Sequence, residues 1–230
     1  MLLANSMNLI VFDIDDTLTK SEFQHQMAYV KAMKAFGITN INDHWKSYHH
    51  HTDSYILKVN YENNISKSFN WSFIDEFEQK MTGILRTLKP VSEIKGARTM
   101  LKTLMNHGHY AMTFATGSLL KPALLKLEQA RIPFQKELVV GSNRVYDREG
   151  IVSKAIEQAK SYYKVQSFDH VLAVGDGLWD LKTAKNLDLH FLGIGPKNYA
   201  DFKAAGLKTH ISDWTNFDLY VLEEQFKIRD

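Results

Sequence analysis

The chain has 230 residues, of which 44% are hydrophobic and 23% charged, a balance typical of a folded protein and unlike that of a disordered or fibrous one. The formal net charge of +2 is close to neutral, and no dense run of Lys and Arg alternates with aromatic residues, so we expect no nucleic-acid partner. The chain has no cysteine, which excludes disulfides, thiolate nucleophiles and cysteine-ligated metal centres.

The first segment, Met1 to Val11, is apolar, and we interpret it as a strand. It has no basic region before the apolar residues and runs directly into Asp13, Asp15 and Asp16, unlike a signal peptide. No apolar stretch approaches the roughly 20 residues that a membrane helix needs. We therefore expect a cytoplasmic protein without a membrane partner.

Short apolar runs, each ended by polar residues, predict strands that are buried on both faces of a parallel sheet. The runs are Leu9 to Phe12, Tyr110 to Ala115, Leu138 to Val140, Val171 to Gly175 and Phe191 to Ile194. Segments with helical spacing alternate with them: Ala97 to His107, Leu119 to Ala130 with Ser118 as its N-cap, and Lys154 to Tyr163 after Ser153. This alternation predicts an α/β fold with a Rossmann-like parallel sheet core. After Ile194 we expect a short strand, His210 to Ser212, and a last helix, Phe217 to Phe226.

Residues 20–95 break this alternation. Glu22 to Phe36, Tyr48 to Val59 and Ser72 to Leu88 have helical spacing, and no strand pattern separates them. We interpret this segment as a helical cap, inserted into a core that is made from residues 1–19 and 96–230.

Polar residues follow three of the predicted strands, at Asp13, Thr116 and Asp176. Ligands of open α/β sheets bind beyond the carboxyl ends of the strands, so these residues should lie close together. Asp13 and Asp15 are two residues apart and can point to one side, whereas Asp16 would point away in an extended chain. A hard divalent cation would hold such carboxylates together. Each group taken alone could be a helix cap or a tight turn, but their joint order and placement favour catalysis.

Four segments carry a resemblance to a known family. Asp13-Ile14-Asp15-Asp16-Thr17-Leu18, Thr116-Gly117-Ser118, Lys154 and Gly175-Asp176-Gly177-Leu178-Trp179-Asp180 resemble, in this order, the four motifs of the haloacid dehalogenase-like hydrolases. The resemblance covers the first strand and roughly residues 96–195. The proline that often follows the lysine of the third motif is absent here.

The resemblance implies a phosphatase that works through an aspartyl-phosphate. Asp13 would be the nucleophile, and Asp15 would protonate the leaving oxygen and then activate water. Thr116 and Gly117 would bind the phosphoryl group, and Lys154 would neutralise its charge. The acid at position 15 favours phosphoryl transfer, because family members that cleave carbon–halogen bonds lack it.

The same resemblance implies a magnesium site. The ligands would be the side chain of Asp13, the backbone carbonyl of Asp15 and the side chain of Asp176, while Asp180 would support the ion through water or from behind. The expected substrate is a small phosphorylated metabolite whose identity stays open, and the protein would be a monomer or a homodimer.

Other functions remain open at this point. A phosphomutase would use the same intermediate but return the phosphoryl group to a sugar. A phosphonate hydrolase would need a cap lysine, for which Lys31 and Lys34 lie in the right region. A catalytically silent protein that binds a phosphate ligand would keep the fold without turnover.

The predicted cap holds a histidine cluster, His44, His49, His50 and His51, which matches no metal-ligand motif because adjacent histidines point in different directions. Whether this cluster has a role stays open. Aromatic residues of the same region are expected to form the core of the cap, with one or two of them facing a substrate: Trp45, Tyr48, Tyr55, Trp71 and Phe73.

Overall fold

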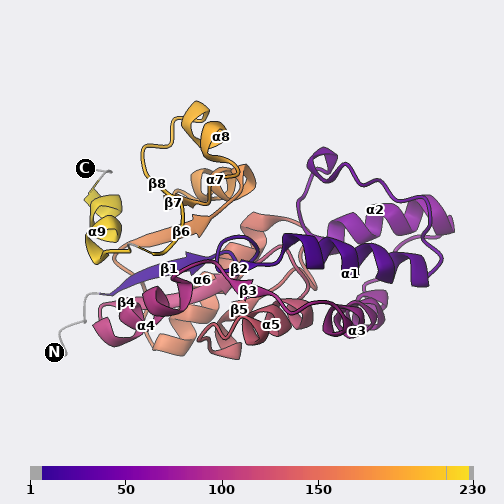
Figure 1. Ribbon diagram of the computed structural model, residues 1–230, viewed down its shortest axis with the longest axis horizontal. Helices are drawn as coiled ribbons and strands as arrows, with labels where there is room; N and C mark the ends of the chain where they lie inside the picture. The colour runs from indigo at the N-terminus through magenta and orange to yellow at the C-terminus, as the bar shows by residue number, and fades with distance from the viewer. Residues whose placement is uncertain (1–6, 216, 228–230) are drawn as a thin grey trace.

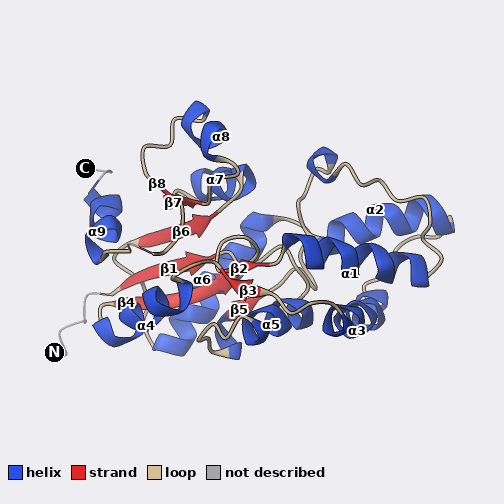
Figure 2. Cartoon of the chain, viewed as in Figure 1, coloured by secondary structure: helices blue, strands red, loops and turns tan. Residues whose placement is uncertain are grey.

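The computed structural model describes residues 7–215 and 217–227. Its core is a six-stranded parallel sheet in the order β5-β4-β1-β6-β7-β8, with helices on its faces (Figures 1 and 2). The strands are β1 (Asn8–Phe12), β4 (Tyr110–Ala115), β5 (Val139–Val140), β6 (Val171–Gly175), β7 (His190–Ile194) and β8 (His210–Ile211). This is the α/β fold that the alternating pattern predicts. The part of the predicted first strand that precedes Met7 lies outside the described residues.

The sheet is parallel and apolar because helical connections cover it on both sides. The central strand β1 pairs with β4 and with β6, which places Ile10 beside Met112 and Leu172, all three of them buried. The flanking helices are α4 (Ala97–His107), α5 (Leu120–Gln129), α6 (Arg148–Tyr163), α7 (Leu178–Asn186), α8 (Tyr199–Ala204) and α9 (Leu219–Lys227). None of the helices in the described part of the chain has the length and apolar character that crossing a bilayer requires.

Three helices interrupt the core after β1. They are α1 (Glu22–Ala35), α2 (Asp53–Ile65) and α3 (Ser72–Thr87), with a short 3-10 helix, Trp45–Ser47, before α2. A two-stranded antiparallel pair, β2 (Thr19–Lys20) with β3 (Ser92–Glu93), brackets the segment. The three helices share an apolar cluster that is separate from the sheet core, and Figure 1 shows them gathered beyond the arrowheads of the central strands.

Several boundaries differ from the predicted ones. Helix α6 begins at Arg148 and not at Lys154, because Asp147 is the N-cap: its side chain accepts a hydrogen bond from the Gly150 N–H at 2.6 Å. A glycine in a first turn disguises a helix start in the sequence, since glycine is a poor helix former.

Two further helices begin at residues other than the predicted ones. Helix α2 begins at Asp53, after Thr52 as N-cap, because residues before it form the 3-10 helix and an extended connection. Helix α5 has Leu119 at its N-cap position without a side-chain cap, so the assignment of Ser118 as N-cap is wrong. The Ser118 hydroxyl instead donates to the Leu119 carbonyl oxygen at 3.2 Å. The remaining predicted elements are present and differ only at their ends.

Candidate active site

A cavity of about 460 Å³ lies at the carboxyl edge of the sheet, between the core and the inserted helices. From the core it is lined by residues that follow β1, β4 and β6. From the inserted segment, α1, the 3-10 helix and the N-terminus of α2 contribute. The lining includes Asp13, Asp15, Thr116, Gly117, Asp176, His25, Tyr29, Trp45 and Asp53.

Three buried carboxylates meet on the core side of the cavity. Asp13, Asp176 and Asp180 each offer an oxygen, and these oxygens lie within 4.8 Å of one another. Burial, followed by the negative charge of Asp180, raises the pKa of Asp13 to about 8. Burial and then the charges of Asp180 and Asp13 raise the pKa of Asp176 to about 9. Without a bound cation, Asp13 and Asp176 therefore keep their protons at pH values where ordinary aspartates are ionised.

Arg148, at the first position of α6, is a cation that contacts this cluster directly. Its Nη2 donates to Asp13 Oδ1 at 3.0 Å and to Asp180 Oδ1, and its side chain is buried with both partners. Burial alone would lower the pKa of Arg148, but the charges of Asp180 and Asp13 raise it above its ordinary value. Once all three carboxyl groups are ionised, their charges outnumber the single guanidinium that contacts them.

The donor set fits a hard divalent cation. All three ligand atoms are carboxylate oxygens, which Mg²⁺ and Ca²⁺ prefer over the nitrogen and sulfur ligands of zinc or copper. Asp180 is further oriented by the Gly177 N–H, which donates to its Oδ2 at 3.1 Å. Across residues 7–215 and 217–227 no other group of three or more histidine or carboxylate side chains has this spacing.

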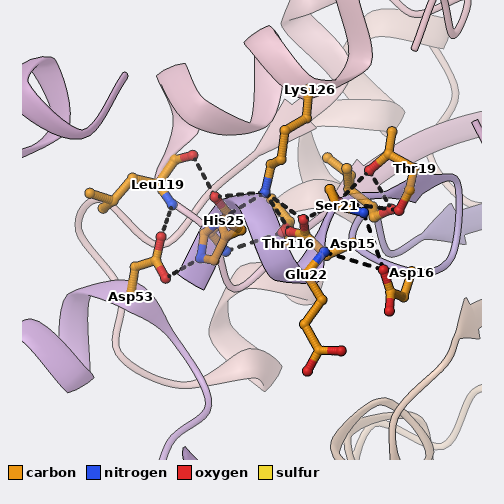
Figure 3. A network of polar contacts seen from close by, with 12 residues as sticks. Asp15, Asp16, Thr19, Ser21, Glu22, His25, Asp53, Thr116, Leu119 and Lys126 are labelled. Carbon is orange, nitrogen blue, oxygen red and sulfur yellow. Dashed lines mark hydrogen bonds and ion pairs between the residues drawn. The ribbon is translucent and has the colours of Figure 1, made fainter. Parts of the chain in front are cut away.

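Asp15 has the opposite environment, although only Ile14 separates it from Asp13. The Lys126 ammonium donates to Asp15 Oδ1 at 2.7 Å and Oδ2 at 2.6 Å, and the Ser21 hydroxyl also donates to Oδ1 (Figure 3). Burial acts to raise the pKa of Asp15, but the charge of Lys126, together with the hydrogen bonds that Lys126 and Ser21 donate, outweighs it and lowers that pKa to about 2.

The turn after β4 lines the cavity beside Asp13. The Thr116 N–H donates to the Val140 carbonyl oxygen at 3.0 Å, and Thr116 Oγ1 accepts from the Ser118 N–H at 3.1 Å. A side chain at Gly117 would lie 2.5 Å from the His51 carbonyl oxygen and 2.8 Å from Arg148 Nη1, so only glycine fits there. The inserted segment rests directly on this turn.

Lys154 is not brought into the site. It lies on α6, its side chain is exposed, and it does not line the cavity. Asp13, Asp15, Thr116, Gly117 and Asp176, in contrast, all line it. The first residue of the same helix, Arg148, reaches the carboxylates, and the late predicted start of α6 is the reason that sequence reasoning missed it.

Lys126 was also missed, although the sequence contains a signal for it. It lies on α5 in line with Leu119, Ala123 and Ala130, at the spacing of one buried helix face, and these residues are buried. A lysine within an apolar stripe needs a buried anionic partner. Nothing in the sequence says which anion that partner is.

The four histidines of the cluster line two adjoining cavities. His44 and His51 line the cavity, and the His51 ring stacks on Trp179 at a centroid distance of 5.0 Å. His49 and His50 lie on an adjoining cavity, and both their rings contact Tyr55. Of the aromatic residues expected in the cap core, all pack in its apolar cluster, and Trp45 also lines the main cavity.

Residues 7–188 match the model of the haloacid dehalogenase-like hydrolase family. The match covers well over half of the chain, so the protein belongs to this family and is a hydrolase, as its fold and its acidic cluster suggest. A search of curated proteins gave no match.

Solved structures share the fold over nearly the whole chain. A hydrolase from Pseudomonas syringae is 19% identical with a TM-score of 0.68, covering 96% of this chain and 99% of its own. A Bacteroides vulgatus protein assigned as a beta-phosphoglucomutase is 16% identical with a TM-score of 0.69, covering 97% and 91%. CbbY from Rhodobacter sphaeroides, solved in complex with phosphate, is 15% identical with a TM-score of 0.64, covering 94% and 99%. Identities this low establish similarity of fold alone.

Proposed function

We propose that this protein is a magnesium-dependent phosphatase that hydrolyses a small phosphate monoester through an aspartyl-phosphate at Asp13. The observation that carries the proposal is the cluster of Asp13, Asp176 and Asp180, of which Asp13 and Asp176 line one cavity together with Asp15. A nucleophilic carboxylate, an acid–base carboxylate and a cation site are the groups that such a reaction needs.

The reaction has two steps, phosphorylation of Asp13 and hydrolysis of the aspartyl-phosphate. First, an oxygen of Asp13 bonds to phosphorus, the bond from phosphorus to the ester oxygen breaks, and that oxygen takes a proton from Asp15. Second, Asp15 takes a proton from water while the water oxygen bonds to phosphorus and the bond to Asp13 breaks. The products are an alcohol and inorganic phosphate, and both carboxyl groups return to their starting states.

The phosphoryl group is bound by the turn after β4 and by Arg148. Thr116 Oγ1 already accepts a hydrogen bond from the Ser118 N–H, so its O–H is available to donate to a phosphoryl oxygen. Gly117 lets its backbone approach the group closely. Because Lys154 is exposed and lies away from the cavity, we assign to Arg148 the role that the resemblance gives to Lys154.

The side chains of Asp13 and Asp176 would hold Mg²⁺ together with the backbone carbonyl of Asp15, and Asp180 would orient the site. When bound, the ion supplies positive charge that stabilises the phosphoryl oxygens and offsets the carboxylates. Arg148 remains between Asp13 and Asp180, where it keeps the nucleophile pointed toward the cavity.

We further propose that residues 20–95 act as a cap domain over a core of residues 1–19 and 96–230. The cap supplies the part of the cavity wall that lies farthest from the carboxylates, including Tyr29 and Trp45. These residues would select the alcohol part of the substrate and exclude water from the phosphoryl group. The substrate would be a small phosphorylated metabolite, bound by a monomer or a homodimer in the cytoplasm.

A phosphomutase stays the second candidate, because one structural relative is assigned as a beta-phosphoglucomutase. A phosphonate hydrolase has less support, since Lys31 and Lys34 are exposed and do not line the cavity. A silent binding protein would be indicated by tight ligand binding without turnover.

The test is release of inorganic phosphate from a panel of small esters, with and without Mg²⁺, by the wild type and by Asp13→Asn. We expect magnesium-dependent release that falls roughly 10⁴-fold in the variant. Asp75→Asn removes an exposed carboxylate of α3 and serves as the matched control, with unchanged activity. Full activity of Asp13→Asn would refute the mechanism, and conversion of a sugar 1-phosphate to its isomer without phosphate release would indicate a mutase.

A further inference from the structure

Lys126 is a lysine with no exposed side-chain surface, and it contacts residues that line the candidate active-site cavity without lining that cavity itself. Its ammonium contacts both carboxylate oxygens of Asp15, His25 Nδ1 at 3.1 Å and Ser118 Oγ at 3.3 Å (Figure 3). Asp15, His25 and Ser118 all line the cavity, but Lys126 does not. Lys126 therefore contacts the Asp15, His25 and Ser118 side chains on the side that faces away from the cavity, where it cannot contact a ligand itself.

A purely structural explanation accounts poorly for this lysine. Burying an ammonium is expensive, and a whole buried ion pair can often be replaced by apolar side chains without loss of stability. The neighbours of Lys126 along its helix face, Ala123 and Leu119, are apolar and buried. The charge is thus better explained by what it does to Asp15.

The contacts continue from Lys126 into the inserted helices. An ammonium can only donate, so His25 Nδ1 accepts, and the proton of the neutral ring is on Nε2. That nitrogen lies 2.9 Å from Asp53 Oδ1, at the start of α2. Asp53 Oδ2 in turn accepts from the Leu119 N–H at 2.9 Å, and the Asp53 N–H donates to the Gly117 carbonyl oxygen at 2.8 Å.

These contacts form a continuous chain of hydrogen bonds and ion pairs. It runs from Asp15 through Lys126 on α5 to His25 on α1 and Asp53 on α2, and it returns to the turn that precedes α5 (Figure 3). The orientation of the Asp15 carboxylate is therefore linked to the seating of α1 and α2 on the core.

We propose that Lys126 is a positioning residue for Asp15, which it holds at the cavity wall in the orientation for proton transfer to the leaving oxygen and from water. The proposal rests on the proposed function, because it needs Asp15 to exchange protons with the ester and with water. It adds to that function a residue of α5 that none of the family motifs contains.

The first experiment compares Lys126→Met with Asp15→Asn and with the double variant, on an alkyl phosphate whose leaving oxygen needs a proton. We expect Lys126→Met to lower kcat about 100-fold with KM changed by less than about 3-fold. In the Asp15→Asn background the same substitution should lower kcat by less than about 3-fold, because residues that act through each other are not additive. The double variant removes both charges and therefore leaves neither ion of the pair buried without its partner.

The second experiment uses 2,4-dinitrophenyl phosphate, whose phenolate leaves without a proton. In Lys126→Met the first step then stays fast while hydrolysis of the aspartyl-phosphate slows. A burst of one phenolate per enzyme should therefore precede a slow steady state. A loss of folding would reduce the burst and the steady state together. Lys121→Met, on the same helix but more than half exposed, is the matched control and should behave as wild type.

The outcomes separate this proposal from the proposed function. Equal losses from Lys126→Met in both backgrounds, or wild-type kinetics of Lys126→Met on both esters, would overturn the positioning role while Asp13→Asn remains inactive. Full activity of Asp13→Asn would overturn the mechanism itself.

Discussion

Asp13 and Asp15 are separated by one residue, yet their surroundings are of opposite charge. Asp13 lies with Asp176 and Asp180, and its pKa is raised to about 8. Asp15 lies against Lys126 and His25, and its pKa is lowered to about 2. Neighbouring positions of one loop thus differ because different helices reach them.

The difference suits the two tasks that we propose for these residues. A nucleophile in an anionic cluster becomes effective once a cation joins it, so its activity can depend on metal. A carboxylate clamped by a lysine keeps one orientation without metal. A phosphoryl dianion bound nearby would oppose the charge of Lys126 and raise the pKa of Asp15 again, toward the range in which it can donate a proton.

Removal of the Asp15 charge should have the largest effect on both stability and activity. Asp15→Asn leaves the Lys126 ammonium buried without an anion, so we expect the free energy of unfolding to fall by about 3 kcal/mol. Loss of proton transfer should lower kcat on an alkyl phosphate by roughly 10²–10⁴-fold. Denaturant unfolding and steady-state kinetics measure the two effects. An unchanged unfolding midpoint would show that the ion pair contributes nothing to stability.

Replacement of the cation at Asp13 comes next. Arg148→Ala should lower kcat/KM about 100-fold, because it removes a charged donor from the proposed phosphoryl site. Lys154→Ala, on the exposed face of the same helix, should change it by less than about 3-fold. Kinetics on one ester at saturating Mg²⁺ compare the two variants. A larger loss in Lys154→Ala than in Arg148→Ala would restore the role that the family resemblance implies for Lys154.

The anionic cluster should also make stability depend on pH. The pKa values of Asp13 and Asp176 are raised on folding from 3.8 to about 8 and about 9, so the folded state binds more protons than the unfolded state between these limits. Stability of the metal-free protein therefore falls as pH rises from about 4 toward 9. Bound Mg²⁺ offsets the repulsion between the Asp13 and Asp176 carboxylates, and this effect is largest at the pH values where both groups are ionised.

Thermal unfolding tests this effect. Addition of Mg²⁺ should raise Tm by about 2–4 °C more at pH 8.5 than at pH 6, the shift that about 1 kcal/mol produces in a chain of this size. Asp176→Asn should remove most of the difference. The same increment at both pH values would show that the ion does not bind at these carboxylates.

The smallest effect is expected at the far end of the Asp15 network. Asp53→Asn replaces one of the two oxygens that accept from His25 and from the Leu119 N–H. Loss of one such bond should lower the free energy of unfolding by about 1 kcal/mol and kcat by less than about tenfold. A loss as large as that of Asp15→Asn would mean that the inserted helices, more than Lys126, orient Asp15.

The sequence by itself determined the sheet core and the residues at its edge. Buried strands such as Tyr110–Ala115 are continuous apolar runs, and parallel strands end at the same edge, so Asp13, Thr116 and Asp176 could be placed together from local patterns alone. The helices of the inserted segment were equally readable, apart from the start of α2.

Only the tertiary structure decided which cations meet these acids. Arg148 and Lys126 lie on helices, where a basic residue normally faces solvent, and whether it does depends on how the helix packs against the sheet. Lys154 and Arg148 belong to the same helix, but only Arg148 at its first turn reaches Asp13. The opposite fields at Asp13 and Asp15 arise from contacts across more than 100 residues of chain, which no local pattern encodes.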